Sequence, residues 1–228
     1  ISLAQMEAVA LLARGDPKCV MTAGQLLRAL APLRADYWML EVGGQRLNRY
    51  RTLYFDTDSF ELFHDHVTDR PERYKVRSRE YIDTRLSFLE VKHHTRKDRT
   101  VKERLPTPRP VIQVTPDMEN WLHGVSPLDG GALAPKLWNA FTRLTLVSKR
   151  MGERVTLDVD LSFWTGERFV QLDGIAIAEV KMGAAGGESP FLAQMRAQRI
   201  HPRGFSKYAI GVGMLYDQVK KNVLKPKM

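Results

Sequence analysis

The sequence predicts an α+β fold in which roughly eight antiparallel strands close into a barrel, with helices packed on the outside. Two observations predict it. Short strand-like segments follow one another with turns at short spacing. Several of these segments also alternate polar with apolar residues, most strictly over residues 154–161, where Val155 and Leu157 share one face. Such alternation is what a sheet with one apolar and one polar face requires.

The chain is expected to form a single domain over residues 1–228. This length fits one barrel with helical decoration, and a hydrophobic content of 43% is enough for a core. Residues 2–13 have the pattern of an amphipathic helix, and Thr22 and Gln25 have capping-box spacing ahead of Leu26. These patterns predict a helical preface over residues 1–33 and a closing helix over residues 206–221.

The remaining elements are predicted from local signals. Residues 37–42 read as a strand that stops at Gly43, with residues 51–56 as its hairpin partner. Residues 58–66 are helix or loop, and Thr115 caps a helix that has Pro116 at its first position. The glycine-containing loop at 183–187 lacks the Gly-Lys-Ser/Thr of a phosphate-binding loop, so a mobile loop is the better interpretation. Further strands are predicted at 72–81, 85–94, 99–105, 142–149, 153–162, 167–172 and 175–182, and a further helix at 190–199.

Positive charge is concentrated between Arg70 and Arg104. Of the 35 lysines and arginines, 12 lie in this segment, against 6 acidic residues, so it carries most of the net charge of +9. Strand periodicity places Lys75, Arg77 and Arg79 on one face. Aligned cations repel one another unless an anion lies among them, which favours a ligand rich in negative charge.

The same pattern recurs on the other predicted strands. Sets that share a face are Glu90, Lys92 and His94; Lys102 and Arg104; Arg154, Thr156, Asp158 and Asp160; and Glu179 and Lys181. For any one strand the simpler interpretation is a solvated face over a core. Several such strands together favour a cationic site, in which a carboxylate such as Glu179 would hold a hard divalent ion.

Composition limits the setting and the partners. Cys19 is the single cysteine, which rules out an internal disulfide framework and makes a reducing, cytoplasmic setting the default expectation. The apolar runs are too short for a membrane span. A pI near 9.7 suits nucleic acid, anionic lipid or polyphosphate. Nucleic acid is not expected, because the cationic strands lack the interleaved aromatics that stack exposed bases.

Several candidate residues have simpler interpretations. His93 and His94 face opposite ways on a strand, so at most one reaches a shared ion, and His94 suits a phosphate donor. Asp158 and Asp160 could bind metal, although buried aspartates more often pair with arginine. Cys19 has no general base beside it and is interpreted as a buried spectator.

Six segments resemble a known family. They are Thr52-Leu53-Tyr54-Phe55-Asp56-Thr57, Lys75-Val76-Arg77-Ser78-Arg79, Leu89-Glu90-Val91-Lys92-His93-His94, Val101-Lys102-Glu103-Arg104, Arg154-Val155-Thr156-Leu157-Asp158 and Ser206-Lys207-Tyr208. In this order they resemble the VTC domain, the catalytic domain of vacuolar transporter chaperone polyphosphate polymerases. That family belongs to the triphosphate tunnel metalloenzymes, also called CYTH-like. The resemblance extends from about Arg14 to Tyr216.

The resemblance implies an eight-stranded tunnel that holds ATP, or another nucleoside triphosphate, and a polyphosphate chain, with a divalent metal, Mn or Mg, on Glu179. The residues that it implies for catalysis are Arg77, Arg79, Lys92, Arg150, Arg154 and Lys207. Those proposed to bind phosphate are Lys18, Lys75, His94, Lys102, Arg104 and Lys181. Lys18 would stand for the lysine of the first tunnel strand.

The expected function is a metal-dependent transfer of the terminal phosphoryl of a nucleoside triphosphate onto polyphosphate. The triphosphatase branch of the superfamily has a Glu-x-Glu-x-Lys pattern on its first strand, where this chain has only Asp16-Pro17-Lys18. That difference favours the polymerase-like branch. Two alternatives stay open, namely a hydrolase of triphosphate or tripolyphosphate with the same fold, and a binding module for polyphosphate without catalysis.

Overall fold

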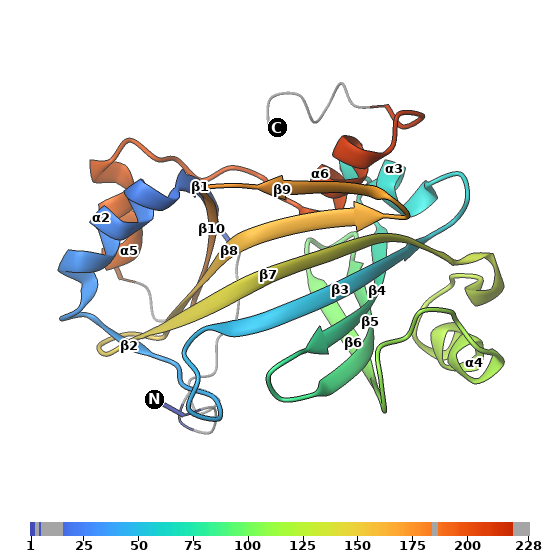
Figure 1. The fold of residues 1–228 in the computed structure, drawn as a ribbon, viewed down its shortest axis with the longest axis horizontal. Helices are drawn as coiled ribbons and strands as arrows, with labels where there is room; N and C mark the ends of the chain where they lie inside the picture. Colours follow the sequence, from blue (N-terminus) through green and yellow to red (C-terminus); the bar gives the residue numbers. More distant parts are fainter. Residues whose placement is uncertain (3–4, 6–15, 184–186, 221–228) are drawn as a thin grey trace. The chain divides into compact units, whose positions relative to one another are not determined.

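The computed structural model describes residues 1–2, 5, 16–183 and 187–220, and Figure 1 shows its helices and strands. The strands are β1 (Lys18–Thr22), β2 (Tyr37–Met39), β3 (Asn48–Asp56), β4 (Arg73–Tyr81), β5 (Leu86–His94), β6 (Thr100–Thr107), β7 (Ala134–Ser148), β8 (Glu153–Thr165), β9 (Arg168–Leu172) and β10 (Ile175–Met182). The helices are α2 (Ala23–Leu33), α3 (Glu61–Val67), α4 (Pro116–Val125), α5 (Pro190–Ala197) and α6 (Lys207–Leu215), with a 3₁₀ turn, η1, at Gly130–Ala132.

The strands form one antiparallel sheet with the order β1-β10-β8-β7-β3-β4-β5-β6, while β2 pairs with β7 and β9 with β8. The predicted α+β class with antiparallel strands is therefore confirmed. Over the described residues this order starts at β1 and ends at β6, so closure into a barrel is not confirmed and stays a prediction. No helix in this part of the chain is long and apolar enough to cross a membrane.

The chain divides into two compact units. Unit 1 comprises Ile1–Arg49, Phe141–Leu161 and Gln171–Phe205, and unit 2 comprises Tyr50–Ala140, Ser162–Val170 and Ser206–Met228. Strands β3, β7, β8 and β9 contribute residues to both units. The prediction of a single domain stays a prediction, and the helix predicted at residues 2–13 lies outside the described residues apart from residues 2 and 5.

Unit 1 has its core on the apolar face of β1, β10 and β8, where α2 and α5 lie on the same side in Figure 1. The predicted capping box is present, because Thr22 and Gln25 each bond the other's backbone N–H and so fix the start of α2. Cys19 is fully buried in this core, as predicted. The core residues are Cys19, Met21, Leu26, Ala29, Leu33, Tyr37, Leu146, Val155, Leu157, Ala176, Ala178, Val180, Phe191, Met195 and Ile200.

The predicted hairpin between residues 37–42 and 51–56 is wrong. β2 ends at Met39 and pairs with the end of β7, with Tyr37 opposite Ser148. The reason lies in Tyr37, which is buried in the core of unit 1 and whose hydroxyl donates to Glu153 and accepts from the Phe191 N–H at 3.1 Å. β3 pairs instead with β4 along the chain.

Unit 2 has its core on the apolar face of β3, β4 and β5, which α4 covers. Leu122 of α4 is fully buried there, and Pro116 is the first residue of the helix, as predicted. Tyr54 and Phe55 are buried, also as predicted. The core residues are Leu53, Phe55, Leu62, Val76, Leu89, Val91, Val111, Leu122 and Leu133.

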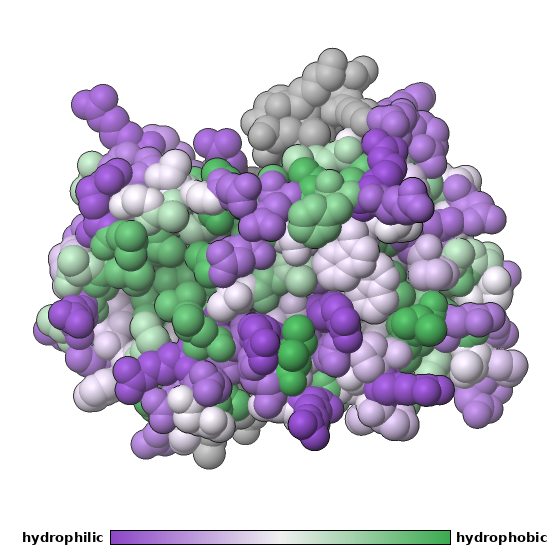
Figure 2. All heavy atoms as spheres, viewed as in Figure 1, coloured by the Kyte–Doolittle hydropathy of each residue, from purple (hydrophilic) through white to green (hydrophobic). Residues whose placement is uncertain are grey.

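Hydrophilic and hydrophobic residues both reach the surface on the face drawn in Figure 2. This is ordinary, because more than half of the surface of a folded protein is contributed by apolar atoms. Exposed apolar side chains alone therefore mark no site, and the candidate site has to be built from charge and geometry.

Candidate functional site

Unit 2 carries rows of charged side chains across neighbouring strands. The register places Lys75 of β4 opposite Lys92 of β5, and Lys92 opposite Lys102 of β6. Residues directly opposite each other in an antiparallel pair share a face, so three lysines lie side by side. Like charges in this arrangement are destabilising, and a bound polyanion would remove the repulsion.

The next row holds the one carboxylate among these cations. Arg77 lies opposite Glu90, and Glu90 lies opposite Arg104. Glu90 is 1% exposed; one of its oxygens accepts from Arg77 at 2.8 Å and the other contacts the Lys102 ammonium. Burial alone would raise the pKa of Glu90, but the charges of Arg77, Arg79 and Lys102 outweigh it and lower the pKa to about 2. Glu90 is therefore ionised and committed to these cations.

Burial and neighbouring charges also act on Lys102 and Arg79. Burial lowers the pKa of Lys102 to about 8, with Arg77 and Arg79 adding to the effect and Glu90 opposing it. Arg79 is only 7% exposed and reaches Thr52 Oγ1 at 3.4 Å, with its guanidinium 5.7 Å from the Tyr50 ring. These cations are already partly desolvated, which strengthens their attraction for an anion.

The other predicted phosphate-binding residues of unit 2 lie around these rows. Lys75 Nζ is 3.1 Å from His66 Nε2, and Arg104 lies over the Phe88 ring at 4.9 Å. His94 pairs with the exposed Asp98 at 3.3 Å, and burial, followed by the charge of Arg73, lowers the pKa of His94. The structure thus brings Lys75, Arg77, Arg79, Lys92, His94, Lys102 and Arg104 onto one face of β4–β6.

His93 lies on the opposite face from these residues. It is opposite Tyr74, with the two rings stacked at 4.3 Å, and its Nε2 is 3.1 Å from Glu72. It takes no part in the charged rows, in agreement with the prediction that the two adjacent histidines face opposite ways.

Helix α6 brings Lys207 to unit 2. Lys207 is the first residue of this helix, and Tyr208 stacks on Tyr54 with ring centroids 4.9 Å apart. Tyr54 lies opposite Arg77 in the register and hydrogen-bonds it. Burial alone would lower the pKa of Arg77, but Glu90 and Tyr54 outweigh burial and raise that pKa. The start of α6 is thereby tied to the strand that carries the paired arginines.

Unit 1 contains the predicted metal ligand. Glu179 of β10 lies opposite Lys18 of β1 and is flanked by two ammonium groups, Lys18 Nζ at 3.8 Å and Lys181 Nζ at 3.7 Å. Lys181 also lies 3.4 Å from Asp16, so it connects two carboxylates. Lys18 begins β1 directly after Pro17, and the Pro17 carbonyl still accepts from Val180 at 3.0 Å.

Two carboxylates of unit 1 are candidates for holding a divalent ion. Asp16 Oδ1 is buried with no hydrogen-bond partner, and the Glu179 side chain is 29% exposed. Across the described ranges, no three His, Cys, Asp or Glu side chains gather as a metal cage. Mg²⁺ needs no such cage, because it is commonly held by one or two carboxylates together with substrate phosphates and water.

The same part of unit 1 has an open depression of about 440 Å³, lined by Asp16, Pro17, Lys18, Pro202, Arg203 and Gly204. The backbone N–H of Arg203 donates to the Lys18 carbonyl at 2.8 Å, which places this loop beside the start of β1. Arg203 is therefore a further basic residue that lines this depression together with Lys18, and no strand pattern in the sequence indicated it.

One arginine of β7, Arg143, was not predicted from the sequence as part of the site. Arg143 binds Asp158 with two hydrogen bonds, at 2.6 and 2.8 Å, and the Asp158 side chain is 4% exposed. A signal was present, because Arg143 is the only cation in the segment 142–148 and a buried aspartate on the next strand needs a partner. The prediction that Asp158 pairs with an arginine is confirmed.

Asp160 is not placed as the strand pattern suggested, and Arg150, which the resemblance implied for catalysis, is exposed. Arg150 lies in the turn between β7 and β8, its side chain is 78% exposed, and its closest described ion pair is with Asp36 at 3.9 Å. Asp160 is exposed with a φ of 53°, so the alternation predicted for Arg154, Thr156, Asp158 and Asp160 ends before it. Arg154 lies opposite Lys181 in the register.

The fold has known relatives among solved structures. A candidate adenylate cyclase from Bacillus halodurans shares 13% identity and a TM-score of 0.51, over 84% of this chain and 92% of that one. Two further matches fall below a TM-score of 0.5 and carry no argument. They are a candidate adenylate cyclase from Vibrio parahaemolyticus (13% identity, TM-score 0.48, 86% and 95% covered) and a candidate adenylyl cyclase from Hippeastrum described with a dominant triphosphatase activity (15%, 0.44, 86% and 94%).

The likeness to the Bacillus halodurans structure concerns the fold alone. The family is more specific. The sequence matches the VTC domain over residues 13–216, and the chain belongs to that family, as the six segments predicted. No curated protein matches the chain.

Proposed function

We propose that the protein is a metal-dependent phosphotransferase that moves the terminal phosphoryl of a nucleoside triphosphate onto a polyphosphate chain. The observation that carries the proposal is the row of three opposed lysines, Lys75, Lys92 and Lys102, beside a row with a single carboxylate. Such a surface suits a ligand with regularly spaced negative charges better than one with a single charge. Membership of the VTC domain family supports polyphosphate as that ligand.

The residues of unit 2 would bind and orient the phosphates. Arg77 and Arg79 would donate to nonbridging oxygens in a fork geometry, and Lys92, Lys102 and Lys207 would add charge. Phosphoryl transfer depends mainly on alignment and on the stabilisation of charge, so these contacts can supply much of the catalysis. Lys75, His94 and Arg104 would extend the binding surface along the chain of phosphates.

In unit 1, Glu179 and Asp16 would hold the divalent ion, which supplies charge neutralisation and alignment of neighbouring phosphates when bound. Lys18 and Lys181 would contact the phosphates next to that ion. Arg154 would keep the role that the resemblance implies, and Arg143, which Asp158 holds, would act in place of the exposed Arg150.

The test is to incubate the purified protein with ATP and Mn²⁺ or Mg²⁺ and to resolve the products. Polyphosphate is the expected product; free phosphate would instead show a hydrolase, and no turnover with tight tripolyphosphate binding would show a binding module. Arg77→Ala should lower turnover by roughly a hundredfold or more. Arg96→Ala, which removes the same charge from an 80% exposed side chain in the turn after β5, is the matched control and should have little effect.

Binding of tripolyphosphate is expected to weaken above about pH 8, where Lys102 loses its proton. An anion favours the charged lysine, so binding between pH 8 and 9 should take up a proton, and the affinity should fall as the pH rises. Calorimetry in buffers of different ionisation enthalpy measures this uptake.

Lys102→Arg should keep the binding and lose the uptake, because arginine stays charged. Lys97→Arg, in the exposed turn between β5 and β6, is the control and should leave the uptake unchanged. An uptake that survives in Lys102→Arg would assign the proton to another group.

A further inference from the structure

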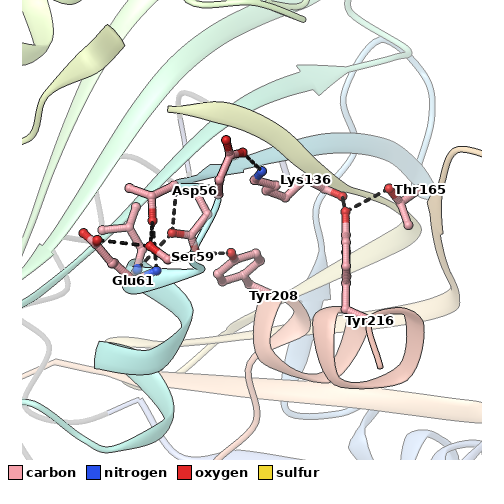
Figure 3. Close-up of polar contacts among 10 residues, drawn as sticks. Asp56, Ser59, Glu61, Lys136, Thr165, Tyr208 and Tyr216 are labelled. Carbon is pink, nitrogen blue, oxygen red and sulfur yellow. Dashed lines mark hydrogen bonds and ion pairs between the residues drawn. The ribbon is translucent and has the colours of Figure 1, made fainter. Parts of the chain in front are cut away.

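Tyr208 connects helix α6 to the charged rows of unit 2. Its side chain is 1% exposed, its hydroxyl donates to Asp56 Oδ2, and its ring stacks on Tyr54. Figure 3 shows Tyr208 at the start of α6, with its hydroxyl pointing toward Asp56. Tyr54 is in turn the neighbour of Arg77 across β3 and β4. A continuous set of contacts thus runs from Asp56 to the paired arginines.

Asp56 is itself held rigidly. It is fully buried at the end of β3 and accepts from the backbone N–H groups of Thr57 at 2.8 Å, Leu62 at 2.9 Å and Phe63 at 2.9 Å. Burial raises the pKa of Asp56, although these hydrogen bonds act to lower it. Burial also raises the pKa of Tyr208, and the charge of Asp56 adds to that effect. No water is needed to satisfy the carboxylate, and the Tyr208 hydroxyl completes its set of donors.

The far end of α6 is anchored by different contacts. The Tyr216 hydroxyl donates to the Lys136 carbonyl at 2.6 Å and lies 2.9 Å from Thr165 Oγ1, as Figure 3 shows. Gly211 packs so closely that a Cβ atom would lie 2.5 Å from Leu137 and 2.6 Å from Phe163. Seven of the nine residues of the helix are buried. The body and the C-terminal end of α6 are therefore seated independently of Asp56.

The bond between Tyr208 and Asp56 acts on the first turn of α6, which is also held by the stacking of Tyr208 on Tyr54 and by the Ser206 side chain, which accepts from the Ala209 N–H. Lys207 is the residue directly before Tyr208 and begins the helix. An anion contact through Lys207 would otherwise also have to order the backbone of this turn, so a preset backbone position makes the contact less costly in conformational entropy.

We propose that Asp56 and Tyr208 are a positioning pair, which orients Lys207 toward the polyphosphate without touching the ligand. This inference rests on the proposed function, since it takes Lys207 to be a phosphate-binding cation. It predicts that the hydroxyl of Tyr208 acts on the ligand only through Lys207.

The experiment is a double-mutant cycle read out as the affinity for tripolyphosphate without metal, measured by calorimetry well below the unfolding temperature of each variant. Tyr208→Phe keeps the stacking on Tyr54 and should weaken binding about five- to tenfold. In a Lys207→Ala background the same change should weaken binding by less than about twofold, because the cation that it positions is gone. Tyr216→Phe, which removes a hydroxyl from the other end of α6, should leave binding within about twofold of the unmodified protein.

The outcomes are distinguishable. A protein that binds no tripolyphosphate contradicts the proposed function. If Lys207→Ala binds as well as the unmodified protein, Lys207 is not a phosphate-binding cation and the positioning pair is wrong. If Lys207→Ala weakens binding but Tyr208→Phe does not, or if the two effects multiply in the double variant, the positioning pair is wrong and the proposed function stands. A loss in Tyr216→Phe as large as in Tyr208→Phe would likewise overturn the pair, because it would reflect the seating of the whole helix.

Discussion

Replacing Glu90 by glutamine is expected to lower the free energy of unfolding by about 3–5 kcal/mol. Glu90 is 1% exposed and lies between Arg77 and Lys102, so the substitution removes the negative charge that both cations face. Gln keeps the shape of the side chain, and the loss is therefore one of charge rather than of packing. Chemical denaturation followed by circular dichroism measures the change.

Glu103→Gln is the matched control for this prediction. Glu103 lies on β6, opposite Val91 and on the other face from Glu90, and it is exposed. The substitution Glu103→Gln removes the same charge from the chain and should change the free energy of unfolding by no more than about 0.5 kcal/mol. Equal stability of Glu90→Gln and the unmodified protein would mean that the cations need no internal anion.

Two further measurements identify the cause as electrostatic. Added tripolyphosphate should stabilise Glu90→Gln more than the unmodified protein, because the anion replaces the missing carboxylate. The pKa of Glu90 is lowered to about 2 from an ordinary value of 4.5, so its contribution is complete above pH 4.5 and is lost as the pH falls toward 2. The difference in the free energy of unfolding between Glu90→Gln and the unmodified protein should shrink over that pH range.

The charged rows could be predicted from the sequence because strand periodicity needs no knowledge of distant partners. Lys75, Arg77 and Arg79 share a face wherever β4 pairs, and the short turns after β4 and β5 make the next strands their neighbours. The sequence could not show that Lys75, Lys92 and Lys102 lie directly opposite one another. That depends on register, which the turns and the apolar face set together.

Pairing between strands that are far apart along the chain could not be predicted from strand periodicity. The hairpin rule favours the nearest strand, whereas β2 pairs with the end of β7, far along the chain, because Tyr37 is buried in the core of unit 1. Arg150 lies in the turn between β7 and β8, and the positive φ of Asp160 ends the alternation of β8. Such single-residue features change which side chains share a face, and composition does not reveal them.

Partners of buried carboxylates were the least predictable part of the site. Each of these carboxylates was visible in the sequence as an acidic residue, but its partners come from other elements. Glu90 pairs with Arg77 and Lys102, Asp158 with Arg143, and Asp56 with Tyr208. The structure commits Glu90 and Asp158 to arginine and lysine. Glu179 and Asp16, which lie near Lys181 in unit 1, are the carboxylates that we propose for the metal ion.

Glu179→Gln is expected to lower metal-dependent turnover by roughly a hundredfold to a thousandfold. The amide keeps the size of the side chain and removes the charge that would hold the divalent ion. Turnover of ATP with Mn²⁺ measures the loss, and titration of Mn²⁺ should show weaker metal binding. Glu188→Gln, a change of the same charge at a side chain that is 75% exposed, is the control and should keep turnover within about twofold.

Binding of tripolyphosphate without metal separates a metal ligand from a salt-bridge partner. Glu179 lies within 4 Å of Lys18 and Lys181, so the simplest alternative is that it serves only to neutralise them. In both cases Glu179→Gln releases the two lysines, and metal-free binding should stay equal or become stronger. If Glu179 is a metal ligand, Glu179→Gln should also lose turnover. If Glu179 only neutralises the two lysines, turnover should not fall, because the freed cations would improve the phosphate contacts. Full Mn²⁺-dependent turnover in Glu179→Gln would show that the ion is held elsewhere, and Asp16, whose Oδ1 is buried without a hydrogen-bond partner, would be the next residue to replace.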